Sequence, residues 1–191
     1  MPKIAEIEPT PNPNARKFVL REPLTYGVAR SYESAAAAQG DPLAAALFAV
    51  PHVTSVFYLD TWLTVTQDGE ADWNELARQV AGPIREAPSA AERTSEMLSG
   101  DTALAQVTPV EELSADARQK LEMIEMMLDD QIRPYLRNDG GDLHVLGIEG
   151  NVVKVHYQGA CGSCPSSLSG TLSAIEYMVR EIDPELEIMP V

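Results

Sequence analysis

The feature that most constrains the fold of this chain is a stretch with little hydrophobic periodicity between two segments that have it. Between Ala87 and Glu112 the sequence carries proline, serine, threonine and scattered charge with little hydrophobic periodicity, which is typical of a flexible linker. A chain of 191 residues has room for one large domain or two small ones, and this interruption favours two. We therefore predict an N-terminal domain over residues 1–87, a linker over 88–112 and a C-terminal domain over 113–191.

The first domain is predicted to follow the order strand, strand, helix, strand, strand, helix (ββαββα). Asp41 and Pro42 suit an N-cap and a first helical residue, so we expect a helix from 43 to 48. Asp72 opens a second helix, in which apolar residues recur at helical spacing as far as Ile84. Alternating, β-branched or aromatic residues mark the expected strands, which are 3–8, 16–21, 53–59 and 62–66.

The second domain is predicted to follow the order αββαβ. Ser114 suits the N-cap of a helix whose apolar residues recur every three or four positions and which is expected to stop around Pro134 to Leu136. The methionines of this helix, Met123, Met126 and Met127, are expected to fill the core. The other expected elements are strands over 143–148, 152–157 and 186–189 and a helix over 166–180. The fold class is therefore α+β, with two helices on one face of a three-stranded sheet.

The first two strands of this domain are predicted to form a hairpin around Gly150. Their aliphatic residues share the face toward the helices, and His144 and His156 are expected to lie opposite each other on the outer face. We interpret these two residues as solvated surface histidines that do not complete a Cys2His2 zinc site. Asp139 and Asp142 stand beside glycines before the hairpin and are expected to serve the geometry of a turn.

The chain has two cysteines, Cys161 and Cys164, with two residues between them. Gly162 lets the backbone bend between them, and Pro165 suits the first turn of a helix. The thiols are thus expected just before a helix N-terminus. The positive end of a helix favours the thiolate, which is the form that binds metal and attacks disulfides.

Three kinds of site are compatible with this cysteine pair. A structural disulfide or a pair of inert thiols is the first, although so short a loop stabilises little. The second is a thioredoxin-like couple that exchanges thiols and disulfides. The third is half of a metal or iron–sulfur site, which usually needs four ligands.

Charge and composition exclude several classes of function. The formal net charge of −15 disfavours nucleic acid and anionic lipid as partners. No apolar run is long enough to cross a membrane, and the first residues resemble neither a signal peptide nor a transit peptide. Two cysteines do not make a secreted disulfide framework, so we expect a reducing cytosol. No nucleophile–base–acid set and no phosphate-binding glycine motif is present in the sequence.

Several motifs taken together resemble the Nfu family of iron–sulfur cluster scaffolds and carriers. In the second domain they are Ile-Arg-Pro at 132–134, Asp-Gly-Gly-Asp at 139–142 and Gly-Ala-Cys-Gly-Ser-Cys-Pro-Ser-Ser at 159–167. Their order is similar to that of the NifU-like C-terminal domain. The Thr-Pro-Asn-Pro-Asn segment at 10–14 and the strand region at 60–65 are similar to the Nfu N-terminal domain.

The resemblance implies a protein that assembles and delivers iron–sulfur clusters, without catalysis. Cys161 and Cys164 then bind a cluster, [4Fe-4S] rather than [2Fe-2S], that bridges two subunits of a homodimer. Cluster donors and recipient apo-proteins are the implied partners, and the lack of an organelle transit segment suggests a bacterial cytoplasmic protein. A thioredoxin-like oxidoreductase is disfavoured because its cysteines follow a βαβ beginning, whereas here a hairpin is expected before them. A zinc-stabilised interaction module is the remaining alternative.

Overall fold

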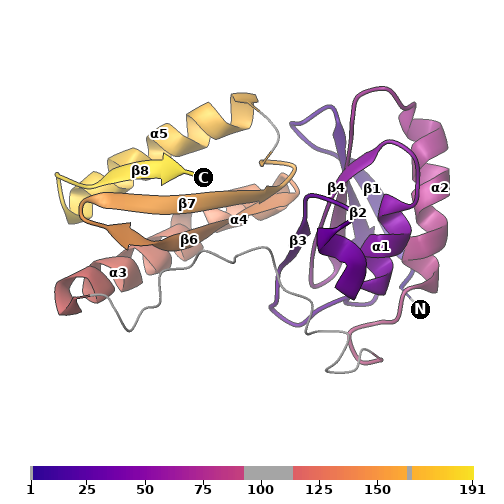
Figure 1. Ribbon diagram of the computed structural model, residues 1–191, viewed down its shortest axis with the longest axis horizontal. Helices are drawn as coiled ribbons and strands as arrows, with labels where there is room; N and C mark the ends of the chain where they lie inside the picture. The colour runs from indigo at the N-terminus through magenta and orange to yellow at the C-terminus, as the bar shows by residue number, and fades with distance from the viewer. Residues whose placement is uncertain (1, 93–113, 163–164) are drawn as a thin grey trace. The chain divides into compact units, whose positions relative to one another are not determined.

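The computed structural model describes residues 2–92, 114–162 and 165–191, except for the side chains of 165–169. The chain divides into two compact units, residues 1–103 and 104–191 (Figure 1). Most of the predicted linker lies outside the described residues, so the linker and the domain limits of 87 and 113 stay predictions. The predicted α+β class, with two sheets and their helices, is confirmed.

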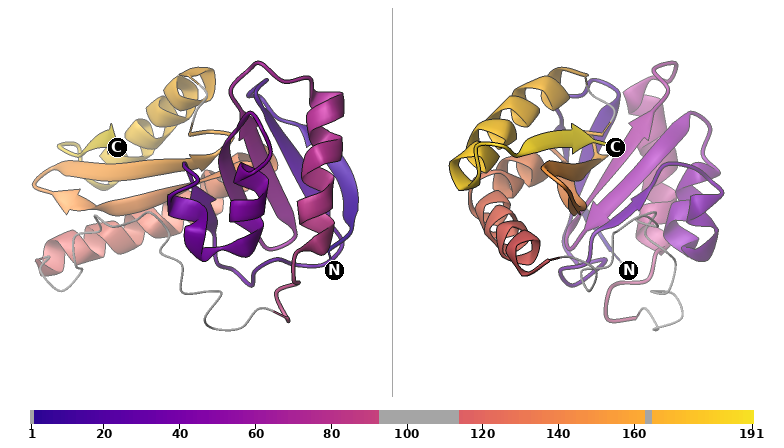
Figure 2. Two further views of the ribbon diagram at one scale, coloured as in Figure 1. Left: turned by 45° about the vertical axis from the view of Figure 1, so that its right-hand side comes forward. Right: turned by 60° about the vertical axis from the view of Figure 1, so that its left-hand side comes forward.

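The N-terminal unit is built on a five-stranded sheet with the strand order β1-β2-β5-β4-β3, in which all neighbours are antiparallel. Its helices, α1 (Pro42–Phe48) and α2 (Trp73–Glu86), cover one face of the sheet (Figure 2) and share a hydrophobic core with it. A short 3-10 helix, η1 (Ala37–Gly40), precedes α1. The strands are β1 (Ile4–Pro9), β2 (Ala15–Leu20), β3 (Arg30–Tyr32), β4 (Val53–Leu59) and β5 (Trp62–Gln67).

The helix starts predicted for this unit are confirmed. Asp41 caps α1 by accepting a hydrogen bond from the backbone N of Ala44 (2.9 Å), and Asp72 caps α2 in the same way. The carboxylate of Asp41 is buried and also accepts hydrogen bonds from the hydroxyls of Tyr32 and Tyr58. Strand β3, which carries Tyr32, was not predicted, because three residues are too few to show a period.

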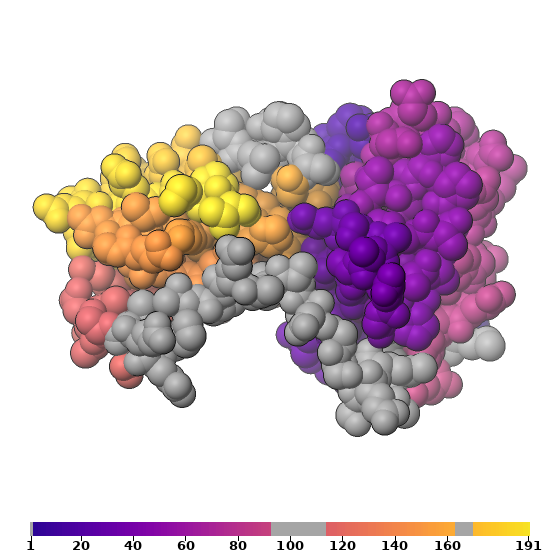
Figure 3. Space-filling view, viewed as in Figure 1, coloured from indigo at the N-terminus to yellow at the C-terminus, as the bar shows by residue number. Residues whose placement is uncertain are grey.

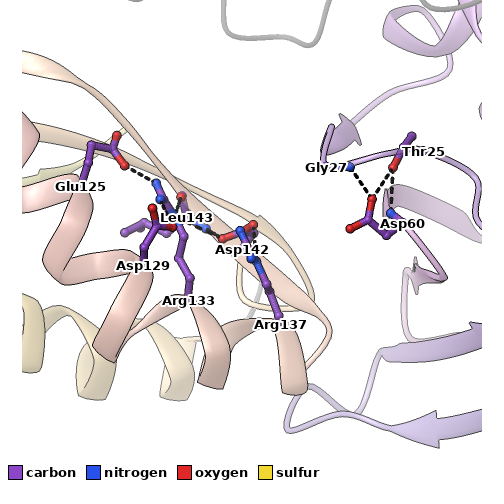
Figure 4. A network of polar contacts seen from close by, with 9 residues as sticks. All are labelled: Thr25, Gly27, Asp60, Glu125, Asp129, Arg133, Arg137, Asp142 and Leu143. Carbon is purple, nitrogen blue, oxygen red and sulfur yellow. Dashed lines mark hydrogen bonds and ion pairs between the residues drawn. The ribbon is translucent and has the colours of Figure 1, made fainter.

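The tight turn between β4 and β5 is held by a polar cluster. Asp60 has a φ of 50°, and its carboxylate accepts a hydrogen bond from the backbone N of Gly27 (2.5 Å). The hydroxyl of Thr25 accepts one from the backbone N of Asp60 (2.7 Å; Figure 4). The turn predicted at Asp60 and Thr61 is therefore confirmed, and it anchors the loop that follows β2.

The C-terminal unit has helices on one face of a three-stranded sheet, as predicted (Figures 1 and 2). Strands β6 and β7 form an antiparallel hairpin, and β8 pairs in parallel with β7. The outer face of the sheet forms part of the molecular surface, in orange and yellow in Figure 3. The elements are α3 (Ala115–Gln131), α4 (Arg133–Asn138), β6 (Gly141–Glu149), β7 (Val152–Gly159), α5 (Pro165–Ile182) and β8 (Glu187–Pro190).

The first helix of this unit differs from the prediction. Ser114 caps α3 as expected, but α3 ends at Gln131 and a separate helix, α4, follows after Ile132. The cause is Pro134, which has no N–H to donate to the carbonyl four residues earlier and is accepted in the first turn of α4 instead. The helical hydrogen bonding of α3 therefore ends at Gln131, and Ile132 separates the two helices.

The methionines of α3 also differ from the prediction. Met127 packs partly against the core, but Met123 is 45% exposed and Met126 is 69% exposed. The buried side of α3 is occupied by Ile124 and Leu128 instead. Within the described parts of both units, no helix is long and apolar enough to cross a membrane.

Candidate functional site

Cys161 lies in the short connection between the end of β7 and the start of α5. Gly159 ends the strand with a φ of 67°, and the backbone N of Gly162 donates a hydrogen bond to its carbonyl (3.2 Å), which closes a tight turn around the cysteine. Cys161 is 2% exposed and belongs to the core of the unit. Cys164 lies outside the described residues, and α5 begins at Pro165, as the sequence predicted for a thiol pair before a helix.

The Asp-Gly-Gly-Asp segment packs directly against this turn. The carbonyl of Gly140, which has a φ of 82°, accepts a hydrogen bond from the backbone N of Ala160 (3.0 Å). Gly141 pairs with Gly159 at the open end of the hairpin. A Cβ atom at Gly141 would lie 2.7 Å from the sulfur of Cys161, so only glycine lets the two backbones approach this closely. The two sequence motifs therefore form one structural unit.

Asp142 anchors the glycine turn to the rest of the unit. Its carboxylate is buried and accepts hydrogen bonds from Nε of Arg137 (3.1 Å) and from the backbone N of Leu143 (2.8 Å; Figure 4). Asp142 was predicted from the sequence to serve turn geometry. Asp142 has a further role in an ion pair with the exposed side chain of Arg137, because the preceding helix α4 carries Arg137 to the start of β6.

Arg133 ties the junction of α3 and α4 to the edge of the sheet. Its Nε donates to the carbonyl of Leu143 (3.1 Å) and lies 3.6 Å from the carboxylate of Asp142. Its two terminal nitrogens donate to Asp129 and Glu125, both at 2.6 Å (Figure 4). The guanidinium thus fixes the start of β6, and through β6 the glycines that contact Cys161.

The two histidines of the hairpin lie opposite each other, as predicted from the alternation. The prediction that both are solvated is wrong for His144, whose Nε2 is buried and has no hydrogen-bond partner among the described residues. Burial lowers the pKa of His144 below its ordinary value. Nδ1 of His156 is 2.9 Å from the carbonyl oxygen of Val191. Across 2–92, 114–162 and 165–191, no three or more His, Cys, Asp and Glu residues are grouped to hold a metal ion.

Two polar side chains beside the cysteine turn were not singled out from the sequence. The hydroxyl of Tyr157 and Oε1 of Gln158 are buried without a hydrogen-bond partner in the described parts of the chain. Burial, with a smaller contribution from Cys161, raises the pKa of Tyr157 to about 12. The sequence could have indicated Gln158, because a buried amide side chain at the end of a strand is expected to have a hydrogen-bond partner. It gave no comparable indication for Tyr157.

The turn places the thiol of Cys161 against the Asp-Gly-Gly-Asp segment. Cys161 lies four residues before the first residue of α5. A hairpin, and not a βαβ unit, precedes it, in agreement with the argument against a thioredoxin-like fold. One chain supplies two sulfurs, and neither histidine is placed with Cys161 in a ligand set among the described residues.

Comparison with known families gives two matches that together span most of the chain. Residues 4–90 match the family described as scaffold protein Nfu/NifU N terminal, and residues 124–189 match the NifU-like domain. The second match contains both the Asp-Gly-Gly-Asp segment and the cysteine pair.

Individual relatives align along nearly the whole sequence. The human mitochondrial NFU1 iron-sulfur cluster scaffold homolog is 33% identical over 184 residues, which cover 95% of this chain and 69% of the relative. The Drosophila ananassae NFU1 homolog is 32% identical and the Arabidopsis thaliana NifU-like protein 4 is 29% identical. In these two cases the alignment covers 95% of this chain but only 62% and 63% of the relative.

Proposed function

Because the chain belongs to the Nfu family of iron–sulfur cluster scaffold proteins, we propose that it carries a [4Fe-4S] cluster bound by the thiolates of Cys161 and Cys164. The cluster is cargo, received from a donor and passed on to recipient apo-proteins. The observation that carries the proposal is the position of Cys161, which packs against Gly141 of the Asp-Gly-Gly-Asp segment and lies four residues before α5 begins.

The number of thiolates that a cluster needs suggests that two chains bind one cluster. Iron–sulfur clusters of this kind normally take four protein thiolates, and one chain has two. A second copy of the same pair is the simplest completion, with a twofold axis that passes through the cluster. We therefore propose one cluster per homodimer.

The negative charge of the chain favours release of the cluster, because it weakens the association of two chains. Each chain carries a formal charge of −15, so two copies repel each other, although salt screens this beyond about 8 Å at physiological ionic strength. Association then depends mainly on the iron–sulfur bonds and on contacts around the cysteine turn. A cluster held at such an interface is easily given up, as a carrier requires.

Anaerobic purification followed by iron and sulfide analysis, a visible spectrum and light scattering tests the proposal. We expect apo protein to be monomeric and loaded protein to be dimeric, with one [4Fe-4S] cluster per two chains. A loaded monomer with a full cluster and no added small thiol would contradict the shared-ligand arrangement. Zinc in place of iron would favour an interaction module, and rapid reduction of insulin would favour a thioredoxin-like oxidoreductase.

A further inference from the structure

An apolar groove lies at the end of the C-terminal unit that is remote from the cysteine turn. Its volume is about 490 Å³, and it is lined by Met123, Met126, Met127, Asp130, Gln131 and Ile182. The first four of these recur at helical spacing along one face of α3, and Ile182 comes from the last turn of α5. The exposed methionines that the sequence analysis assigned to the core are therefore the wall of a surface groove.

The charged residue among those that line the groove is acidic. Asp130 lines it, and Glu122 precedes Met126 by one helical turn; among the described residues neither carboxylate has an ion-pair partner. Lys120, a turn earlier on α3, is bound to Asp116 and Asp183, both at 2.8 Å. An apolar surface with unpaired carboxylates at its edge is complementary to an apolar surface with cations at its edge.

We propose that this groove binds an amphipathic helical segment of a partner protein, with apolar side chains on one face flanked by lysine or arginine. Helices commonly enter such grooves with apolar side chains one turn apart. Methionine side chains are flexible and polarisable, so one groove adapts to segments of different sequence, as a carrier with several recipients needs.

The position of the groove separates docking from cluster binding. The cysteines precede Pro165 at one end of α5, and Ile182 is at the other end of this helix of 18 residues. At 1.5 Å per residue the two ends are about 26 Å apart. A partner segment in the groove thus leaves the cysteine turn free for the cluster and for a second subunit.

A pair of synthetic peptides tests the proposal on the full-length chain. Both are helical and carry leucine on one face; one has lysine on the other face and its control has glutamate. We expect the lysine peptide to bind, as followed by fluorescence anisotropy, and Met126→Asp to weaken it about tenfold or more. Since this substitution adds a negative charge, electrostatics alone would strengthen binding of the basic peptide.

Two further variants complete the design. Met189→Asp is the matched control, because Met189 is 41% exposed on β8 and does not line the groove; it should bind as the wild type does. Replacement of Glu122 and Asp130 by lysine should shift the preference toward the glutamate peptide.

Equal binding by Met126→Asp and the wild type would overturn the proposal. So would a concentration-dependent self-association that Met126→Asp abolishes while neither peptide binds, because a second copy would then be the occupant. Iron per chain, measured on the same variants, should stay unchanged, so a failure of docking is distinguishable from a failure of cluster binding.

Discussion

Replacement of Gly141 by alanine tests whether the glycine turn positions Cys161. The added Cβ would lie 2.6 Å from the carbonyl oxygen of Gln158, 2.7 Å from the sulfur of Cys161 and 3.0 Å from its Cβ. Ordinary contacts of this kind begin at 3.4 Å, so β6 and the cysteine turn must separate by several tenths of an ångström. The carbonyl is backbone in the hairpin, and it cannot move without disturbing the pairing of Gly141 with Gly159.

The expected change in the free energy of unfolding is the difference between two opposing effects. Overpacking a tight site costs about 1–3 kcal/mol, whereas replacing glycine by alanine restricts the unfolded chain and returns about 0.4–1 kcal/mol. We expect the free energy of unfolding of the C-terminal unit to fall by about 1–2 kcal/mol. For a unit of this size that lowers the Tm by roughly 4–16 °C. Displacement of Cys161 should also reduce the iron bound per chain.

The matched control is Gly170→Ala, the same substitution inside α5. Nothing lies within 4 Å of a Cβ at Gly170, and alanine in a helix is favoured over glycine by about 0.5–1 kcal/mol. Hydrogen exchange of peptides from β6 and β7 at increasing urea concentration reports on the C-terminal unit. The fluorescence of Trp62 and Trp73, which are both in the N-terminal unit, should be unchanged in either variant. Equal effects of the two alanines would refute the close approach at Gly141.

Substitutions at the two cysteines, at Asp142 and at His144 have defined outcomes. Cys161→Ala or Cys164→Ala should each abolish stable cluster binding and leave the fold intact, as judged by circular dichroism and iron content; full reconstitution of either variant would remove that cysteine from the ligand set. Asp142→Ala should destabilise the C-terminal unit in urea by about 1–3 kcal/mol, because it removes the buried carboxylate that accepts hydrogen bonds from Arg137 and from the backbone N of Leu143, whereas Glu149→Ala, which breaks an exposed pair with Lys154, should cost under about 1 kcal/mol. Since the folded-state pKa of His144 is lowered by burial, the unfolded chain binds more protons below about pH 6.5, and stability should fall as the pH drops through this range. His144→Gln should flatten that dependence, and an unchanged pH profile would show that His144 is not the group responsible.

Local sequence signals predicted the strands of both sheets except the three-residue β3. Capping side chains at Asp41, Asp72 and Ser114 each accept a hydrogen bond from the first turn of the helix that they were expected to begin. The alternation around Gly150 predicted the hairpin and the pairing of His144 with His156. These signals succeed because a cap or a strand period depends on neighbouring residues only.

Features that depend on distant residues were not predictable in the same way. The close approach of Gly141 to Cys161 requires β6 and β7 to bring together two segments far apart in the sequence. The exposure of Met126 is decided by Ile124 and Leu128, which take the buried side of α3. The buried Nε2 of His144 likewise reflects what packs around the hairpin and cannot be read from the alternation of its strands.

The parallel pairing of β8 with β7 has a consequence for the order in which the C-terminal unit folds. The hairpin closes over a single tight turn at Gly150, whereas pairing of Val152 with Glu187 must wait for the crossover that contains the cysteines and α5. Contacts between near neighbours form faster than contacts that close long loops. Gly141 and Gln158 are therefore in place early, and the slow closure of the crossover is the step that completes the surroundings of the thiols. A nascent or refolding chain thus completes the surroundings of Cys161 last.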